Sequence, residues 1–126
     1  MTITKQEIGK LGENLATRYL SSVGYKILKR NFRDKYGEVD IIAECDNELV
    51  FIEVKARTNL KYGRPIDAVT RQKQMHILRT AQYYIFINKL EHKKIRFDVI
   101  EVYIIDGKYR IKHIKNTGIV FSFRFK

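Results

Sequence analysis

The chain of 126 residues contains one cysteine, one proline and no tryptophan. The single thiol, Cys45, excludes an internal disulfide and a four-cysteine zinc site. Cys45 stands beside a predicted turn with no histidine near it in the sequence, which favours a structural thiol over a nucleophile. No apolar run approaches the roughly 18 residues of a membrane span, and residues 1–10 lack the apolar core of a secretion signal. We therefore expect a soluble, cytoplasmic protein with no membrane partner.

Acidic residues are scarce in the second half of the chain. Residues 1–54 carry 8 Lys/Arg against 9 Asp/Glu, whereas residues 55–126 carry 17 against 5, and the whole chain has a net charge of +11. This asymmetry predicts a surface that meets a polyanion beside a cluster of acidic groups. A basic surface that binds nothing is the alternative. The hydrophobic content of 44% argues against disorder, and the length predicts one domain over residues 1–126.

Hydrophobic periodicity predicts two helices and a set of strands. Apolar residues three and four apart indicate a helix over residues 3–22, which a Thr4–Glu7 capping box begins, and a second over residues 66–87, with Pro65 in its first turn. Strands are predicted at residues 25–33, in a hairpin at 37–57, at 95–105 and at 108–114, with a strand or packing tail at 120–126. This order predicts an α/β domain whose mixed sheet has a central antiparallel hairpin flanked by two main helices.

The hairpin of residues 37–57 contains the residues that could form a catalytic or metal site. Its turn is expected at Asp46-Asn47, because both residue types tolerate left-handed backbone angles. That turn sets the register, which opposes three pairs of residues: Glu44 and Leu49, Ile42 and Phe51, Asp40 and Glu53. Two opposed carboxylates repel unless a positive group lies between them, and magnesium prefers such oxygen ligands. Lys55, two residues past Glu53, shares the same face of its strand.

Charged residues on a strand face are more often a solvated surface or a weak ion pair than a site. One feature of the sequence argues against that alternative here. Glu53 is flanked by Ile52 and Val54 in the most apolar strand of the chain, where a carboxylate needs a partner. The opposed carboxylates and the lysine beside them therefore remain a candidate metal and phosphate site.

Basic residues follow the hairpin directly. The loop expected at residues 56–64 contains Arg57, Lys61 and Arg64, so we predict that it contacts phosphates. Gln72 and Lys73 are expected to face the same site from the first turns of the second helix, and Lys73 is the fourth residue predicted to bind nucleic acid. His76 is expected at the surface or its boundary, and the three histidines of the chain have no metal-ligand spacing with each other.

The order of these motifs resembles the restriction-endonuclease-like superfamily of PD-(D/E)xK nucleases. Glu13 stands on the first helix, and Gly37-Glu38-Val39-Asp40 and Glu53-Val54-Lys55 follow on the hairpin, with Val39 in place of the motif's proline. Closer still, the chain resembles the YraN-type family of uncharacterised bacterial proteins, which shares this valine and is considered similar to archaeal Holliday-junction resolvases. The resemblance runs from about residue 9 to residue 102 and includes these further motifs: Gly12-Glu13, Gly24-Tyr25, Arg30-Asn31, Phe51-Ile52-Glu53-Val54-Lys55-Ala56-Arg57 and Arg96-Phe97-Asp98-Val99.

The resemblance implies a restriction-endonuclease-like core and a set of site residues. Asp40, Glu53 and the backbone carbonyl of Val54 would hold a magnesium or manganese ion. Lys55 would orient the attacking water and stabilise charge at the phosphate, and Glu13 would be an accessory acid that reaches the metal through water. These residues would make the chain a magnesium-dependent endonuclease acting on structured DNA, as a resolvase does, and a homodimer would suit the symmetric cutting of two strands.

Three hypotheses follow for the function. The first is a metal-dependent endonuclease, which needs all of the acidic and basic site residues. The second is a nucleic-acid-binding module that keeps the fold and the basic half without cutting. Such a module would not need Asp40, which repels phosphate unless a metal is bound. The third is an interaction or scaffold protein whose charges are a solvated surface, and it predicts no affinity for nucleic acid at moderate salt.

Overall fold

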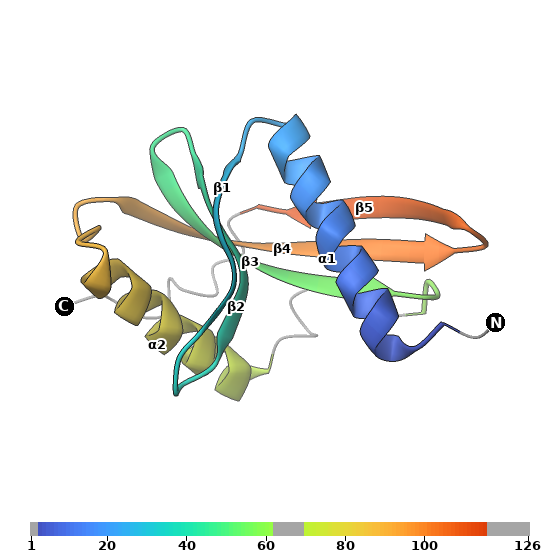
Figure 1. Ribbon diagram of the computed structural model, residues 1–126, viewed down its shortest axis with the longest axis horizontal. Helices are drawn as coiled ribbons and strands as arrows, with labels where there is room; N and C mark the ends of the chain where they lie inside the picture. The colour runs from blue at the N-terminus through green and yellow to red at the C-terminus, as the bar shows by residue number, and fades with distance from the viewer. Residues whose placement is uncertain (1–2, 62–69, 116–126) are drawn as a thin grey trace.

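The structure, a computed structural model, describes residues 3–61 and 70–115 (Figure 1). In chain order these ranges form α1 (Lys5–Ser22), β1 (Lys26–Arg33), β2 (Glu38–Cys45), β3 (Glu48–Arg57), α2 (Arg71–Ile87), β4 (Lys94–Ile105) and β5 (Lys108–Ile114). Within them, no helix is long and apolar enough to cross a membrane. The elements follow the order that the sequence predicts.

The strands form a single mixed sheet in the order β1-β2-β3-β4-β5. Neighbouring strands are antiparallel except β3 and β4, which run parallel. Parallel neighbours need a crossover, and α2 provides it between the two strands. The predicted mixed sheet with a central antiparallel hairpin and two main helices is confirmed, and the arrangement is consistent with a restriction-endonuclease-like core.

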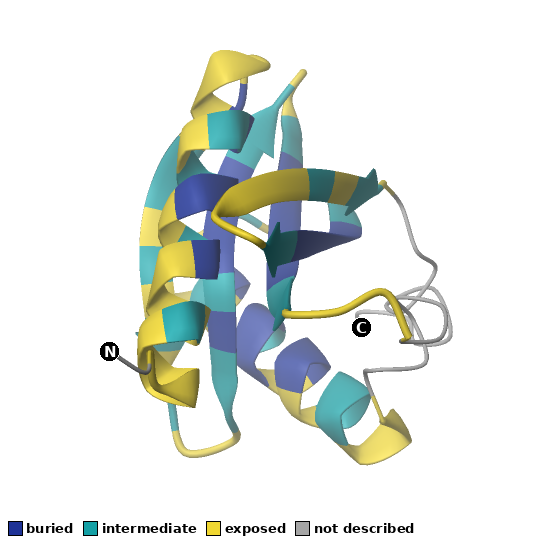
Figure 2. Ribbon diagram, turned by 90° about the vertical axis from the view of Figure 1, so that its right-hand side faces the viewer, coloured by how far each residue is buried: buried dark blue, intermediate teal, exposed yellow. Residues whose placement is uncertain are grey.

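Two apolar clusters lie on opposite faces of the sheet, one under each helix. Successive residues of β3 point to opposite faces, so Phe51 packs with Ile77 and Ala81 of α2, whereas Ile52 packs with Leu20 of α1. Figure 2 shows the buried residues along the strands and along the helix sides that face them. The sheet therefore has an α1 face and an α2 face, and each side chain of a strand belongs to one of them.

The turn of the β2–β3 hairpin has the backbone that the sequence predicts, and the turn between β4 and β5 has a similar one. Asp46 and Asn47 have φ of 50° and 65°, as a two-residue hairpin turn of this hand requires at both positions. The resulting register pairs Glu44 with Leu49 and Ile42 with Phe51, which confirms the predicted pairing. Asp106 and Gly107 likewise have positive φ, of 52° and 74°, between β4 and β5.

The helix starts are set by threonine caps. Thr4 and Glu7 form the predicted capping box of α1. Thr70 has an extended backbone and its hydroxyl accepts from the Lys73 N–H, so α2 begins at Arg71 and not at residue 66. Pro65 and residues 66–69 of the predicted helix lie outside the described residues, as does the predicted tail at 120–126.

A fully buried carboxylate on β4, that of Asp98, joins motifs that are far apart in the sequence. Asp98 is fully buried on the α1 face, where Arg96 Nε donates to Asp98 Oδ1 at 3.0 Å. The Tyr25 hydroxyl donates to Asp98 Oδ2 at 3.3 Å, and His113 Nε2 lies 2.8 Å from the same atom. The Gly24-Tyr25 and Arg96–Val99 motifs thus meet in one buried polar network, which ties β4 to β5 and to the start of β1.

Two glycines let helices approach the sheet closely. A Cβ at Gly12 of α1 would lie 2.9 Å from the Ala56 Cβ of β3, and one at Gly37 would lie 3.1 Å from the His76 Cβ of α2. Both approaches bring helix residues beside the hairpin end that carries Asp40 and Lys55.

The close approach at Gly12 gives a prediction. Gly12→Ala is expected to destabilise the fold by about 1–3 kcal/mol, because the added methyl group overpacks the α1–β3 contact and outweighs the better helix propensity of alanine. Gly9→Ala is the matched control, since no described atom lies within 4 Å of a Cβ at Gly9 and the change should stabilise the helix. Urea denaturation of both variants measures the difference, and equal stabilities would contradict the tight contact.

Candidate functional site

The site lies where β2 and β3 separate. Their paired positions run from Cys45 and Glu48 to Ile41 and Ile52. One residue further along, the Asp40 carboxylate accepts the Val54 N–H through Oδ2 at 2.8 Å. A side chain thus takes the place that a main-chain carbonyl holds in a regular ladder, and it turns the Asp40 carboxylate toward β3.

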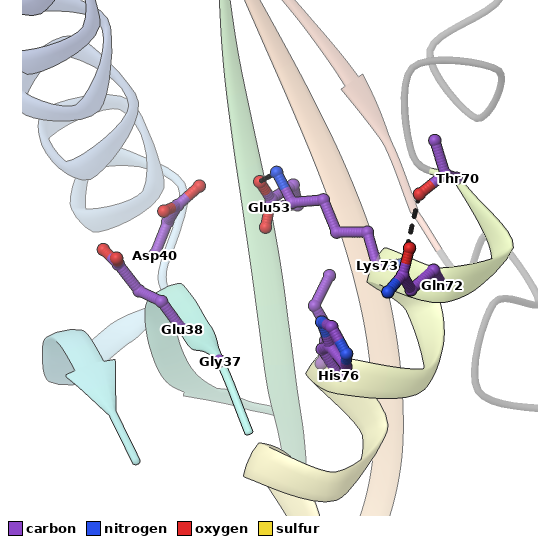
Figure 3. Close-up of a pocket in the computed structure, with 9 residues that line it drawn as sticks. Gly37, Glu38, Asp40, Glu53, Thr70, Gln72, Lys73 and His76 are labelled. Atoms are coloured by element: carbon purple, nitrogen blue, oxygen red, sulfur yellow. Dashed lines mark hydrogen bonds and ion pairs between the residues drawn. The ribbon is translucent and has the colours of Figure 1, made fainter. Parts of the chain in front are cut away.

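A hollow of about 470 Å³ opens between the end of β2, β3 and the first turns of α2 (Figure 3). Glu53 lies in its wall and is only 4% exposed. The lining residues come from three elements: Gly37, Glu38 and Asp40 from β2 and its entry, Glu53 from β3, and Thr70, Gln72, Lys73, His76 and Ile77 from α2 and its cap. The opposed carboxylates predicted from the hairpin register therefore share one hollow.

Two lysines meet the buried Glu53 carboxylate. Lys73 Nζ of α2 lies 2.9 Å from Glu53 Oε1, and Lys55 Nζ lies 3.6 Å from the same atom. Lys55 reaches it along the α2 face of β3, two residues further on, as the period of a strand predicts. One oxygen of the nearly buried carboxylate thus meets two ammonium groups, and a charge in this position requires such a partner.

The crowding of acids changes the protonation of Asp40. Burial, followed by the Glu53 charge, raises the pKa of Asp40 to about 8, against the effect of the Val54 N–H. Glu13 and Glu38 raise that pKa further. The end of β2 therefore holds more negative charge than the groups around it balance, and a bound cation would reduce this excess.

The two lysines respond differently to the same surroundings. Burial, and then the contact with Lys73, lowers the pKa of Lys55. Burial also acts to lower the pKa of Lys73, but the adjacent Glu53 carboxylate outweighs it and the pKa is raised. Lys73 is therefore the firmly charged partner of Glu53, and Lys55 is the lysine that gives up its proton more readily.

Glu13 approaches the site from α1 and is held by β1. Its Oε1 accepts from Arg30 Nη2 at 3.0 Å and from Asn31 Nδ2 at 2.8 Å. Asn31 has φ of 52°, at the position of β1 that faces Asp40. The Arg30-Asn31 motif thus anchors the glutamate, whose charge acts on Asp40.

The donor set suits an oxygen-loving cation in part. Among residues 3–61 and 70–115, no group of three acidic, histidine or cysteine side chains could hold a metal. Asp40 and Glu53 supply two carboxylates. Because the N–H and C=O of a strand residue point to the same side, the Val54 carbonyl faces Asp40 as its N–H does. Two carboxylates, one carbonyl and waters are a ligand set that magnesium accepts.

The basic residues predicted to bind phosphates differ in their surroundings. The chain continues β3 through Arg57, so the loop begins later than predicted, and Arg57 Nε pairs with the buried Glu101 at 3.0 Å. Lys61 is exposed, Lys73 is paired with Glu53, and Arg64 lies outside the described residues. Of these four, Lys61 is the described residue whose charge faces solvent.

His76 lines the hollow although the sequence analysis assigned it no role. The signal was available, because residues three and four apart share one face of a helix. His76 is four residues after Gln72 and three after Lys73, so it shares the helix face on which these two were expected to meet the site. His76 can lie close to β2 because Gly37 has no Cβ. The spacing of residues along a helix does not predict this contact.

The raised pKa of Asp40 gives a prediction for the metal-free protein. Between its ordinary pKa of 3.8 and about 8, the folded state binds more protons at Asp40 than the unfolded state. The free energy of unfolding should therefore fall as the pH rises through this window. Asp40→Asn removes that loss, so the variant should gain stability over the wild type at pH 8 and little at pH 4.

Thermal unfolding in the presence of a chelator measures this difference across the pH range. Glu91→Gln, which neutralises an exposed carboxylate outside the hollow, controls for the loss of one charge. A stability difference between wild type and Asp40→Asn that stays constant from pH 4 to pH 8 would contradict the crowding of acids around Asp40.

Comparisons with known proteins agree with the motifs. The model of "Uncharacterised protein family UPF0102" matches residues 12–102. A UPF0102 protein of Clostridioides difficile is 47% identical over 115 residues, which cover 91% of this chain and 99% of that protein. One from Clostridium botulinum is 49% identical over 121 residues, which cover 93% and 98%.

Two solved structures are similar at low identity. Pyrococcus furiosus SfsA in complex with Ca²⁺ matches with a TM-score of 0.41 and 15% identity, over 90% of this chain and 64% of that one. The protein SSO0001 matches with a TM-score of 0.36 and 18% identity, over 94% and 57%. The chain thus spans less than two thirds of either structure. From the family match and the relatives that align along nearly their whole length, the chain belongs to the uncharacterised protein family UPF0102, the YraN-type family.

Proposed function

We propose that this protein is a metal-dependent endonuclease that hydrolyses phosphodiester bonds in structured DNA. The observation that carries the proposal is the meeting of Asp40, Glu53 and Lys55 at the open end of the β2–β3 hairpin, beside a hollow. Opposed carboxylates destabilise a sheet unless a cation bound between them neutralises their repulsion. A lysine next to such a cation can stabilise the charge of a phosphate. The net charge of +11 supports a polyanionic substrate.

Each residue has a role that its position supports. Asp40, Glu53 and the Val54 carbonyl would hold a magnesium or manganese ion. A bound ion of this kind supplies an activated water and neutralises charge on the phosphate. Lys55, whose pKa is lowered by burial, would orient the water and stabilise charge at the phosphate. Glu13 would add negative charge to the site from α1.

A non-catalytic nucleic-acid-binding module is the second candidate. One observation favours it: the Lys73 ammonium, 2.9 Å from Glu53, already balances one of the two acids without a metal. Asp40 speaks against it, because a module that only binds phosphates gains nothing from an acid crowded against Glu53, whose charge repels the backbone whenever it is ionised. Resolvases that cut two strands symmetrically are dimers. The single chain gives no support for the expected homodimer.

A cleavage assay with binding calorimetry tests the proposal. We expect the wild type to cut at least one member of a panel of junctions, flaps, nicked duplexes and single strands with magnesium or manganese, and to bind calcium without efficient turnover. Asp40→Ala and Glu53→Ala should lose both ion binding and cleavage. Lys55→Ala should keep ion binding but lose roughly 10²–10⁴-fold in rate, because the lysine acts beside the ion and is not a ligand.

Lys94→Ala is the matched control, since it removes an exposed lysine at the start of β4, outside the hollow and outside the predicted phosphate contacts. A folded wild-type protein that binds no divalent ion and cuts no member of the panel would make the binding module the better explanation.

The position of Lys73 gives a further prediction. Lys73→Met should destabilise the metal-free protein by about 1–3 kcal/mol, because the nearly buried Glu53 then keeps only the more distant Lys55. It should also tighten magnesium binding, since the ammonium no longer competes for Glu53. Urea denaturation and calorimetry measure the two effects, with Lys61→Met as control. Weaker magnesium binding by the variant would show that Lys73 supports the ion site and does not compete with it.

A further inference from the structure

The second hairpin presents a row of cations that no role above uses. On β5, Lys108, Arg110 and Lys112 are all exposed. They alternate with residues of the opposite face, because successive side chains of a strand point to opposite sides. Ile114 continues the row and packs into the cluster under α2, whereas Ile111 packs into the cluster under α1. The three cations, called the β5 strip below, therefore lie on the α2 face.

The β5 strip lies on the same face as the candidate active site. The register pairs Lys55 of β3 with Glu101 of β4, and Glu101 with Lys112 of β5. Neighbouring strands are about 4.8 Å apart, so the backbones of Lys55 and Lys112 are separated by roughly 10 Å across β4. A chain molecule that leaves the hollow along this face meets Lys112 first, then Arg110, then Lys108.

The acid between the two sites is neutralised by other groups. Glu101 is fully buried, and it accepts from Arg57 Nε at 3.0 Å and from the Tyr103 hydroxyl at 2.8 Å. Among the described residues, no ion pair involves a cation of the β5 strip. The strip is thus a set of charges directed to solvent, about 6.7 Å apart along the strand, a spacing comparable to that of phosphates in an extended nucleic-acid strand.

A hollow at the end of the strip adds apolar and aromatic surface. It encloses about 320 Å³ and is lined by Leu60, Tyr103, Ile105, Lys108, Tyr109 and Arg110. Tyr109 alternates with the cations of the strip and so belongs to the α1 face of the edge strand β5. It is 60% exposed, and Leu60 is 68% exposed. Tyr103 is held in place by its hydrogen bond to Glu101. Figure 2 shows β5, the strand that leads into the grey C-terminal trace, as mostly exposed.

The combination indicates a single strand and not a duplex. Phosphates of any nucleic acid would explain the cations, but duplex bases are stacked within the helix and cannot use an exposed tyrosine. An unpaired base stacks on such a ring at the edge of the sheet, and the basic side chains on the other face of β5 hold the phosphates that precede it. We propose that the β5 strip and this hollow bind a single-stranded DNA segment that extends from the cleavage site along the strip and passes over the edge strand β5, with a base against Tyr109.

This inference rests on the proposed function for its substrate, so its test measures binding without cleavage. Fluorescence anisotropy with chelator present follows a labelled oligothymidine and a duplex of the same length over a range of salt concentrations. The strip variant combines Lys108→Ala, Arg110→Ala and Lys112→Ala. Its matched control combines Lys10→Ala, Arg18→Ala and Lys29→Ala, which removes three exposed cations from α1 and β1.

The strip variant is expected to lower the slope of log affinity against log salt for the single strand by about 2, because each lost phosphate contact contributes roughly 0.7. The control variant should keep the wild-type slope. If the strip variant keeps the wild-type affinity and slope while the wild type binds, the inference is wrong. If the wild type binds neither probe, the nucleic-acid partner of the proposed function is wrong as well.

Tyr109 separates base stacking from charge. Tyr109→Ala should weaken single-strand binding roughly 5- to 100-fold and leave duplex binding unchanged, whereas Tyr109→Phe should retain it, since the ring and not the hydroxyl makes the contact. Equal losses of single-strand and duplex affinity in Tyr109→Ala, or no loss in either, would overturn the stacking hollow.

Discussion

The site depends on a carboxylate buried in the most apolar strand of the sheet. Glu53 is almost out of contact with water, between residues that fill both hydrophobic clusters. A charge in such a place must be balanced by a partner at short distance, because desolvation costs more than distant charges return. Two lysines from different elements meet that need, and the position of α2 over the hairpin is fixed in part by one of them.

The sequence predicted most of this arrangement, because the hairpin follows rules of period two and of turn backbone. The turn at Asp46-Asn47 sets the register, and the register brings Asp40 to Glu53 without knowledge of the rest of the fold. The predicted start of α2 was wrong, because apolar spacing extends past the threonine that caps the helix. Local periodicity does not show where a cap interrupts a helix, and a side-chain hydrogen bond decides it.

Other features need the tertiary structure. Arg57 looked like a phosphate ligand in a loop, but pairing with β4 extends its strand and places it on a buried glutamate. The sequence showed that Lys73 could face the site, yet not that it would contact Glu53. The alternation of cations on β5 was visible in the sequence, but its relation to the site was not. It follows from the parallel pairing of β3 with β4, and strand order cannot be deduced from hydrophobic patterns.

The strand order of the sheet repeats the order of the strands in the chain. Three of the four strand pairs are hairpins or near neighbours in sequence, so those contacts close short loops and form rapidly. The two acids of the site are part of the first such unit that a turn of two residues closes. Lys73 arrives later, with the crossover that joins the parallel strands. We therefore expect the carboxylates to be brought together with Lys55 of the same hairpin but before Lys73 reaches them, so a low pH, at which Asp40 keeps its proton, should speed the early steps of folding.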